Sequence, residues 1–521
     1  MGSAVTNSNS ELRPIATIPL TRPRAVTRLR LSVNWRLAAQ AAALFVVFAA
    51  LFAVVQFATP GIADNDGYYH IKMGLLVREQ GLKPPFVWLP LSILSRDAFY
   101  DHHMLYHVFL GLFAGDGTPG ALTLGAKIAA VVMPALAFIA VWWLLRGQGV
   151  AWASIWAVGL FAVSQAFLYR MSMPRAQSAS LLILALALHW MLTRRYRLLI
   201  PLGFVYVWAY NAFPLLLALG GLTAAASFLT ERRVEWQALA YPAIGIGLAL
   251  VVNPYFPHNI TFILNHLAPK IGESETAVGN EWYPYQTWTV VENSGFSLAA
   301  FLLGALAIGW RGKRIDRPTL TAFMAAVAFG FLLFKSRRFV EYYPAFALIF
   351  AALSVSPILR SWTADKARWQ RWIPVGLMAA LVVPLGITLG QAREAMASSK
   401  PADLYAEASS WLKTHTPPGG MVFQTDWDDF TRLFFYNTQN LYTIGLDPTY
   451  MELYDAGLYA EWVDITQGRV TRPSDLIRDR FGAEYVMSDL GHLNFLREAK
   501  DDPGLNEVYR DAYAVIFEVV P

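Results

Sequence analysis

Two carboxylates stand two positions apart at the start of the first polar stretch after a long apolar run. The residues read Asp64-Asn65-Asp66-Gly67-Tyr68-Tyr69-His70. Paired acids with this spacing can bind a divalent cation, or one of them can accept a proton as a general base. As an alternative, Asp64 or Asp66 caps a helix predicted from His70 to Arg78. The Tyr-Tyr-His segment is unusual for a plain cap, so the two interpretations stay open.

A second group of acid and imidazole side chains lies further along the same stretch. Asp101-His102-His103 are followed by His107, one helical turn beyond His103. Carboxylates and imidazoles suit zinc or manganese, and this group could complete a metal site with the first pair of acids. Each histidine alone is more often a satisfied interface residue. The two acidic segments together predict either metal binding or acid–base chemistry.

Arginines gather in two other short segments, which contain Arg170 and Arg175, and Arg337 and Arg338. An arginine fork binds phosphate through two hydrogen bonds, and a phosphate at a membrane interface is usually a lipid head group. The alternative is an ion pair inside the protein, such as Arg338 with Glu341. These arginines are therefore candidate ligands of a lipid phosphate.

Aromatic and acidic side chains are mixed in two further places. Glu281 and Trp282 lie in the 254–294 segment, and Trp427 and Asp428 lie in Asp426-Trp427-Asp428-Asp429-Phe430 after a strand-like run. Aromatic faces stack on pyranose rings and acids accept from sugar hydroxyls, which favours sugar binding. The alternatives are an interfacial aromatic belt for the first pair and a solvated turn for the second.

The composition indicates which elements must position these residues. Hydrophobic residues make up 55% of the 521 and charged residues 15%, with a mean hydropathy of +0.37, which is too apolar for a soluble domain. The absence of cysteine excludes disulfides and thiol catalysis. The basic residues lie in short loops rather than in one stripe, so the net charge of +5 does not indicate nucleic acid. Apolar runs long enough to span a membrane are predicted near 37–59, 121–145, 152–168, 178–193, 198–212, 213–229, 237–253, 295–310, 319–334, 339–356 and 373–391.

The loops between these runs predict an orientation. Every second loop carries arginine or lysine, as the positive-inside rule expects of cytoplasmic loops. The predicted domains are a cytoplasmic basic tail at 1–36, a transmembrane module at 37–391 and an extracytoplasmic domain at 392–521. The large first loop, 60–120, and the segments 169–177, 254–294 and 335–338 then lie on the outer face. The C-terminal part predicts a helix from Asp403 to Leu412 and strands at 421–425, 441–445 and 513–519. The protein is thus expected to be a polytopic α-helical membrane protein of about eleven spans with an α/β domain.

This layout resembles the GT-C superfamily of integral-membrane glycosyltransferases, and most closely the catalytic subunit of oligosaccharyltransferase. The resemblance rests on Asp64-Asn65-Asp66 in the first loop and on Asp426-Trp427-Asp428-Asp429-Phe430, where that family has Trp-Trp-Asp-Tyr-Gly. Two departures stand out. The family's second acidic motif is replaced by Arg170, Pro174 and Arg175, and the tryptophan motif is only half kept.

The resemblance implies an inverting transfer of a sugar or oligosaccharide from a polyprenyl-phosphate-type lipid to a glycan, lipid or protein acceptor on the outer face of a bacterial-type inner membrane. Asp66, helped by Asp64 or His70, would be the base; Asp101, His102 and His103 would hold a divalent metal, Mg²⁺ or Mn²⁺, where one is used. Arg170, Arg175, Arg337 and Arg338 would bind the donor phosphate, and Tyr69, Glu281, Trp282, Trp427 and Asp428 would contact substrate. The alternative is a transporter, flippase or binding protein for a lipid-linked sugar, which needs no base. The predicted spans carry almost no charge, which disfavours a transport path through them.

Overall fold

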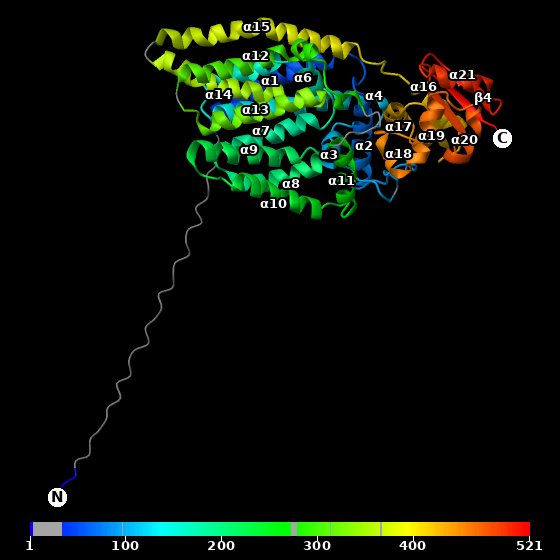
Figure 1. Cartoon of the computed structure of the whole chain (residues 1–521), viewed down its shortest axis with the longest axis horizontal. Coiled ribbons are helices and arrows are strands. Elements are labelled where there is room, and N and C mark those ends of the chain that lie inside the picture. Colours follow the sequence, from blue (N-terminus) through cyan, green and yellow to red (C-terminus); the bar gives the residue numbers. More distant parts are fainter. Residues whose placement is uncertain (4–33, 96, 272–278, 313, 365–366, 521) are drawn as a thin grey trace. The chain divides into compact units, whose positions relative to one another are not determined.

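The protein is a polytopic bundle of apolar helices followed by a small α/β domain (Figure 1). The computed structural model describes residues 1–3, 34–95, 97–271, 279–312, 314–364 and 367–520, so most of the predicted basic tail lies outside the described residues. The chain divides into two compact units, Met1–Ala42 and Ala43–Pro521, and every site discussed below lies within the second.

The apolar runs fold as predicted. Seven described helices are long and apolar enough to cross a membrane, and four apolar stretches are shorter. The long helices are α1 (Trp35–Gln56), α4 (Pro119–Gly147), α9 (Pro214–Glu231), α12 (Thr287–Arg311), α13 (Arg317–Lys335), α14 (Tyr343–Ala364) and α15 (Ala367–Ala397). The shorter stretches are α5 (Ala153–Val158) with η1 (Gly159–Ala162), α7 (Gln177–Leu192), η2 (Tyr196–Leu198) with α8 (Leu199–Ala209), and α10 (Gln237–Val251). Each corresponds to one predicted run, although α15 continues past the predicted end at 391.

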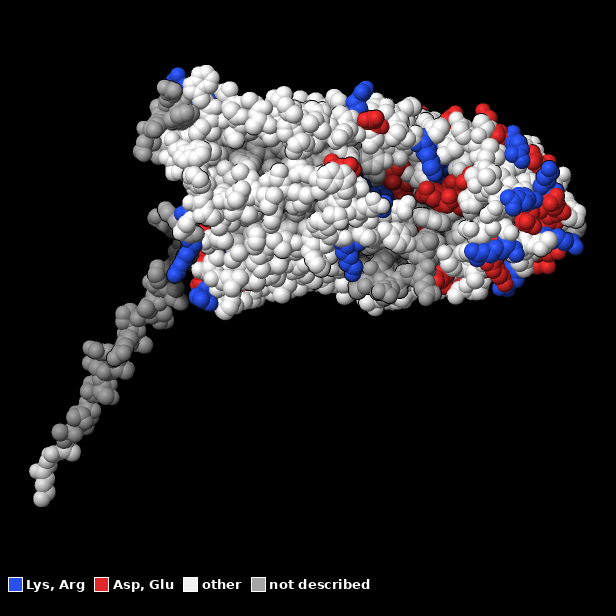
Figure 2. All heavy atoms as spheres, turned by 45° about the horizontal axis from the view of Figure 1, so that its top comes forward, with Lys and Arg blue, Asp and Glu red and all other residues white. Residues whose placement is uncertain are grey.

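Short helices fill the segments that the sequence predicts between the spans. They are α2 (Asn65–Gln80), α3 (Met104–Gly111), α6 (Gln165–Met171), α11 (His258–Ile271), η3 (Asn280–Trp282) and η4 (Arg337–Glu341). Figure 1 shows α2, α3 and α11 at the end of the bundle next to the C-terminal domain. In Figure 2 the side of the bundle is nearly free of charged side chains, whereas acidic and basic side chains gather towards that domain. An uncharged lateral surface of this kind is what lipid requires.

The C-terminal domain contains one mixed sheet. The strands are β1 (Met421–Gln424), β2 (Leu441–Tyr442), β3 (Tyr485–Asp489), β4 (Leu505–Arg510) and β5 (Ala514–Val519), in the order β2-β1-β3-β5-β4. β1 is parallel to β2 and β3, and β5 is antiparallel to β3 and β4. The helical elements are α16 (Ala406–His415), η5 (Trp427–Asp429), α17 (Phe430–Tyr436), α18 (Thr449–Tyr454), α19 (Ala456–Thr466), α20 (Pro473–Phe481) and α21 (Leu493–Asp501). The carboxyl ends of β1 and β3 therefore meet at one edge, where their loops lie together.

A buried arginine connects this domain to the first loop of the bundle. Arg432, on α17, is fully buried, and its Nε donates to Oδ1 of Asn65 at 2.9 Å. Its guanidinium also lies 4.3 Å from the ring centre of Tyr68. The amide of Asn65 in turn donates to the carboxylate of Asp428. The turn after β1 and the acidic start of α2 are thus held against each other.

Close packing of α8 against α10 depends on a glycine, and this gives a test of the bundle. A Cβ on Gly245 would lie 2.0 Å from the carbonyl oxygen of Ile200, whereas a Cβ on Gly247 would meet nothing within 4 Å. We expect Gly245→Ala to destabilise the protein by about 1–3 kcal/mol through overpacking. Gly247→Ala, on the same helix, should leave stability unchanged or raise it, because alanine favours a helix. Thermal unfolding of the two purified variants in one detergent measures the difference, and equal melting temperatures would contradict this packing.

Candidate active site

A cavity of about 530 Å³ lies where the first loop, the arginine segments and the C-terminal domain meet. Most of the residues singled out in the sequence line it. They are Asp64, Asp66, Tyr69, His70, His102, His103, Arg170, Arg175, Glu281, Trp282, Arg338, Trp427 and Asp428. Asp101 and Arg337 are not among its lining residues. Segments separated by more than three hundred residues in the chain therefore contribute to one wall.

Arg175 joins the two acids of the first loop. Its Nη2 lies 2.9 Å from Oδ2 of Asp66, and its Nη1 lies 3.4 Å from Oδ1 of Asp64. Asp64 occupies the N-cap position of α2, but its side chain makes no capping hydrogen bond. The capping alternative therefore does not account for Asp64. Asp66 lies in the first turn of α2, which begins five residues earlier than the predicted helix start at His70.

The Asp64 carboxyl lies in a confined environment. Burial raises its pKa to about 7, against the opposing charge of Arg175 and with a further increase from Asp66. Its Oδ2 is buried and has no hydrogen-bond partner among the described residues. Burial therefore favours the protonated form of the Asp64 carboxyl, whereas the Asp66 side chain is 27% exposed.

Glu281, on η3, lies among three guanidiniums. Its carboxylate is 2.9 Å from Arg170, 2.9 Å from Arg338 and 3.5 Å from Arg175. Burial alone would raise the pKa of Glu281, but the Arg175, Arg338 and Arg170 charges hold it well below its usual value. A carboxylate bound by several arginine forks occupies the kind of position that a phosphate takes.

The remaining ion pairs differ from the predicted alternative. Glu341 is fully buried and pairs with Arg170, whose Nε donates to it at 2.9 Å. Arg338 pairs with Glu281 rather than with Glu341, donates to the Tyr210 hydroxyl and lies 4.7 Å from the ring centre of Trp282. Arg337 instead donates to the carbonyl of Pro284 and lies over Tyr285. Adjacent arginines on the η4 turn therefore project in different directions, and only Arg338 reaches the cavity.

The histidines form a hydrogen-bonded row behind the cavity wall. The carboxylate of Asp101 lies 2.7 Å from Nδ1 of His107, and Nε2 of His107 lies 2.8 Å from Nδ1 of His70. Burial, with smaller contributions from His107 and Arg175, lowers the pKa of His70 well below its usual value, so its imidazole is neutral. Asp101 is thereby engaged by His107 instead of facing the cavity.

His102 and His103 line the cavity through ring contacts. His102 stacks on Phe262, and His103 stacks on Tyr210. Within the described residues, Asp101, His102 and His103 do not converge into a group of metal ligands; one group of three acids does so, and it lies elsewhere. The predicted three-residue metal site is therefore not assembled as the sequence suggested.

Several cavity residues carried no clear signal in the sequence. Tyr210 and Tyr450 line the cavity, and Tyr450 contacts His266 on α11. A lone tyrosine at the end of an apolar run is indistinguishable from a membrane-interface residue.

Comparison with known proteins extends this picture. No protein family matches the sequence, and no curated protein matches it. Among solved structures, the oligosaccharyltransferase AglB from Archaeoglobus fulgidus aligns with a TM-score of 0.65 at 14% identity, covering 89% of this chain and 71% of AglB. ArnT from Cupriavidus metallidurans aligns with a TM-score of 0.56 at 17% identity, covering 92% of this chain and 98% of ArnT. The chain has the GT-C fold.

The GT-C fold is also shared with the arabinofuranosyltransferase AftD from Mycobacteria, with a TM-score of 0.57 at 15% identity over 93% of this chain and 40% of AftD. Within this GT-C fold, Arg175 stands where the second acidic motif was expected, and it is the residue that binds both acids of the first loop. Arg175, which departs from the family's second acidic motif, is therefore an ion-pair partner of Asp64 and Asp66 in the first motif.

Proposed function

We propose that this protein is an inverting glycosyltransferase that moves a sugar or oligosaccharide from a polyprenyl-phosphate-type lipid to an acceptor on the outer face of the membrane. The observation that carries the proposal is the shared cavity: acids suited to deprotonate an acceptor and arginines suited to bind a phosphate line it together. Solved structures with the same fold include AglB with a dolichol-phosphate and an inhibitory peptide, and ArnT with undecaprenyl phosphate. These ligands support a lipid-phosphate donor.

In the proposed reaction, the acceptor oxygen attacks the anomeric carbon and displaces the lipid phosphate. Asp66 takes the acceptor proton, with Asp64 or His70 beside it in the cavity. The bond between the anomeric carbon and the phosphate oxygen breaks, and negative charge accumulates on that oxygen. Arg338, Arg175 and Arg170 stabilise this charge by hydrogen bonds that strengthen as it develops. Attack from the side opposite the leaving group inverts the anomeric centre.

Glu281 occupies the position where we place the donor phosphate. Its carboxylate already accepts from Arg338 and Arg170. The three arginines pair with four carboxylates, those of Asp64, Asp66, Glu281 and Glu341. A phosphate must therefore replace Glu281 as an arginine partner, and Glu281 is then free to accept from a sugar hydroxyl. Trp282, stacked beside Arg338, would cover the sugar face.

A divalent cation would fit the first-loop acids. Asp64 has a buried oxygen without a partner, and Asp66 faces the same cavity. These two carboxylates would hold Mg²⁺ or Mn²⁺, with His102 or His103 at the cavity wall. A cation bound there would offset the excess of acid and favour the binding of an anionic donor.

The C-terminal domain would position the acceptor. Trp427 and Asp428 line the cavity from η5, and Tyr69 lines it from α2. Asp428 is fixed by the amide of Asn65, next to the proposed base. An acceptor bound by the domain would thus present its hydroxyl to Asp66.

The test is whether the protein cleaves the donor. Purified full-length protein in lipid nanodiscs would be given a panel of sugars linked to undecaprenyl phosphate and undecaprenyl diphosphate, with a detergent extract of bacterial envelope as the source of acceptor. We expect release of free lipid phosphate together with labelled acceptor for one member of the panel. Movement of intact lipid-linked sugar across proteoliposomes without any cleavage would favour the transporter instead.

A further inference from the structure

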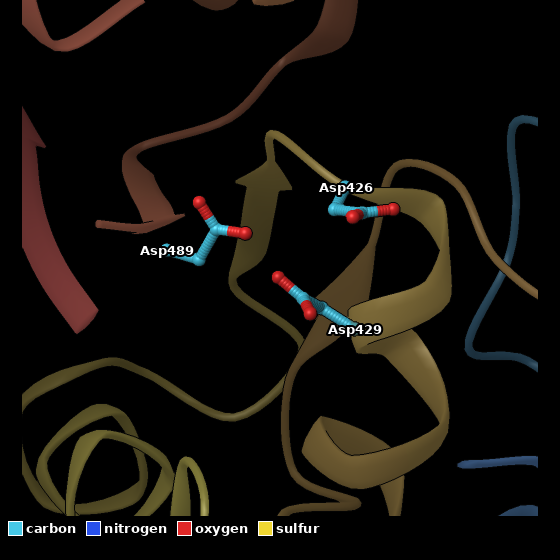
Figure 3. A group of neighbouring side chains, drawn as sticks. All are labelled: Asp426, Asp429 and Asp489. Carbon is cyan, nitrogen blue, oxygen red and sulfur yellow. The ribbon is translucent and has the colours of Figure 1, made fainter. Parts of the chain in front are cut away.

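Three aspartates of the C-terminal domain meet at the edge of its sheet, next to the cavity. Asp426 follows β1, Asp429 ends η5 and Asp489 ends β3. One carboxylate oxygen from each lies within 4.8 Å of the others. Figure 3 shows the side chain of Asp429 extending from its helical turn towards Asp489, with Asp426 beside it. Because β1 and β3 are parallel, the fold itself brings these acids together.

Asp489 and Asp426 are each oriented by donors on one oxygen. Oδ1 of Asp489 accepts from the backbone amides of Gly491 and His492 and from Nδ1 of His492. Oδ1 of Asp426 accepts from the backbone amide of Asp428. In each case, these hydrogen bonds from described residues reach Oδ1, and none of them occupies Oδ2. Ligand carboxylates oriented by neighbouring donors in this way are characteristic of metal sites.

The observation that carries the inference is the buried carboxylate of Asp429, because its hydrogen bonds to the described residues are incomplete. It is 2% exposed, and its Oδ2 is buried without a hydrogen-bond partner among the described residues. The Tyr405 hydroxyl contacts its carboxylate without occupying this oxygen. A buried, unpaired carboxylate oxygen is costly, so the arrangement calls for a positive ligand.

The basic side chains near Asp426, Asp429 and Asp489 do not neutralise the three acids completely. Among the described residues, His492 is the one basic side chain that forms an ion pair with the three acids, through Asp489. Lys400 pairs instead with Asp428, at 3.7 Å. We infer that Asp426, Asp429 and Asp489 bind a hard divalent cation, Ca²⁺ or Mg²⁺, because all three ligands are carboxylate oxygens.

Such a cation would fix the turn that faces the cavity. Asp426 belongs to both the three-acid group and the cavity lining, and Asp428, two residues later, accepts from Asn65. The cation would thus hold residues 426–429, next to the cavity, in place. This inference stands whether or not the protein transfers sugars, because it concerns the stability and ion binding of the domain.

The test uses terbium as a probe of the site in the full-length protein. After treatment with a chelator, Tb³⁺ excited through tryptophan is expected to give saturable luminescence, aided by Trp427 beside Asp426. Ca²⁺ or Mg²⁺ should displace it and should also raise the melting temperature of the chelated wild type. Which of the two ions competes at lower concentration identifies the preferred ion.

Variants separate this site from the first-loop acids. Asp429→Asn and Asp489→Asn should each weaken Tb³⁺ binding by roughly 10- to 100-fold and remove the effect of the cation on the melting temperature. Asp501→Asn, on the exposed face of the same domain, should leave both intact, whereas Asp66→Asn should remove only the binding that belongs to the first-loop acids. Asp429→Asn should also melt no lower than wild type in chelator, which shows that it folds. Absence of luminescence and of a cation-dependent melting shift in the wild type, or full binding by Asp429→Asn, would overturn the inference in favour of a protonated Asp429.

Discussion

Replacing Asp66 by asparagine is expected to reduce sugar transfer by a factor on the order of 10²–10⁴, the range found when a general base is removed. The amide has nearly the same size, yet it cannot accept the acceptor proton. Asp66 lies 2.9 Å from Arg175, and its side chain is the more exposed of the two first-loop acids. The loss should fall on kcat, because the base acts on the acceptor hydroxyl and not on the donor phosphate.

Two measurements isolate the chemical role of Asp66. Asp97→Asn, an exposed acid of the same loop, should keep full activity. The affinity of Asp66→Asn for undecaprenyl phosphate should equal or exceed that of the wild type, since Arg175 loses one carboxylate partner. Turnover by Asp66→Asn at the wild-type rate would contradict the assignment of Asp66 as the base.

Replacing Arg338 by alanine is expected to raise the KM for the lipid donor and to lower kcat, for a combined loss on the order of 10²–10³ in kcat/KM. Arg338 enters the cavity with two hydrogen-bonding nitrogens, one on Glu281 and one on Tyr210. We propose that the phosphate takes the place of Glu281, so alanine removes a ligand of both the bound donor and the leaving group. Arg338→Lys should recover part of the affinity, because it restores the charge but not the fork.

The chain provides a matched control at the neighbouring position. Arg337→Ala removes the same charge from the same turn, but Arg337 lies over Tyr285, away from the cavity. Its KM for the donor should stay within about twofold of the wild type, since Arg337 does not line the cavity. Equal losses in the two variants would show that the arginines act through the net charge of the segment rather than through contact.

The helical architecture was readable from the sequence because it depends on local composition. Each apolar run identified in the sequence is a helix or a pair of short helices in the structure. The strands at 421–425, 441–445 and 513–519 were also predicted; β1 and β5 confirm the first and the last, whereas β2 covers only Leu441–Tyr442 of the second. β3 and β4 were missed; the β3 run, Tyr485–Asp489, ends in polar residues and shows no clear alternation. The orientation of the termini stays a prediction from the basic loops.

The arrangement of the site could be predicted only in part, because side-chain pairing is a tertiary property. The sequence suggested that Asp66, Arg175 and Arg338 share a face, and the structure places all three in one cavity. The sequence could not show that the side chains of Arg338 and Arg337 point in different directions, because both residues occupy one short turn. Asp101 was expected to be a metal ligand. Its carboxylate instead makes a hydrogen bond with His107, four residues beyond His103.

The contact between Arg432 and Asn65 limits how the C-terminal domain can be exchanged for that of another chain with the same fold. Arg432 donates both to Asn65 and to the carbonyl of Pro401, and it packs on Tyr68. A chimera that receives its C-terminal domain from another chain loses the arginine but keeps Asn65 and Tyr68, and buried polar groups without partners are costly. The start of α2 and the C-terminal domain must therefore be exchanged together in such a chimera. The first loop and the last quarter of the chain are thus expected to change together in sequence.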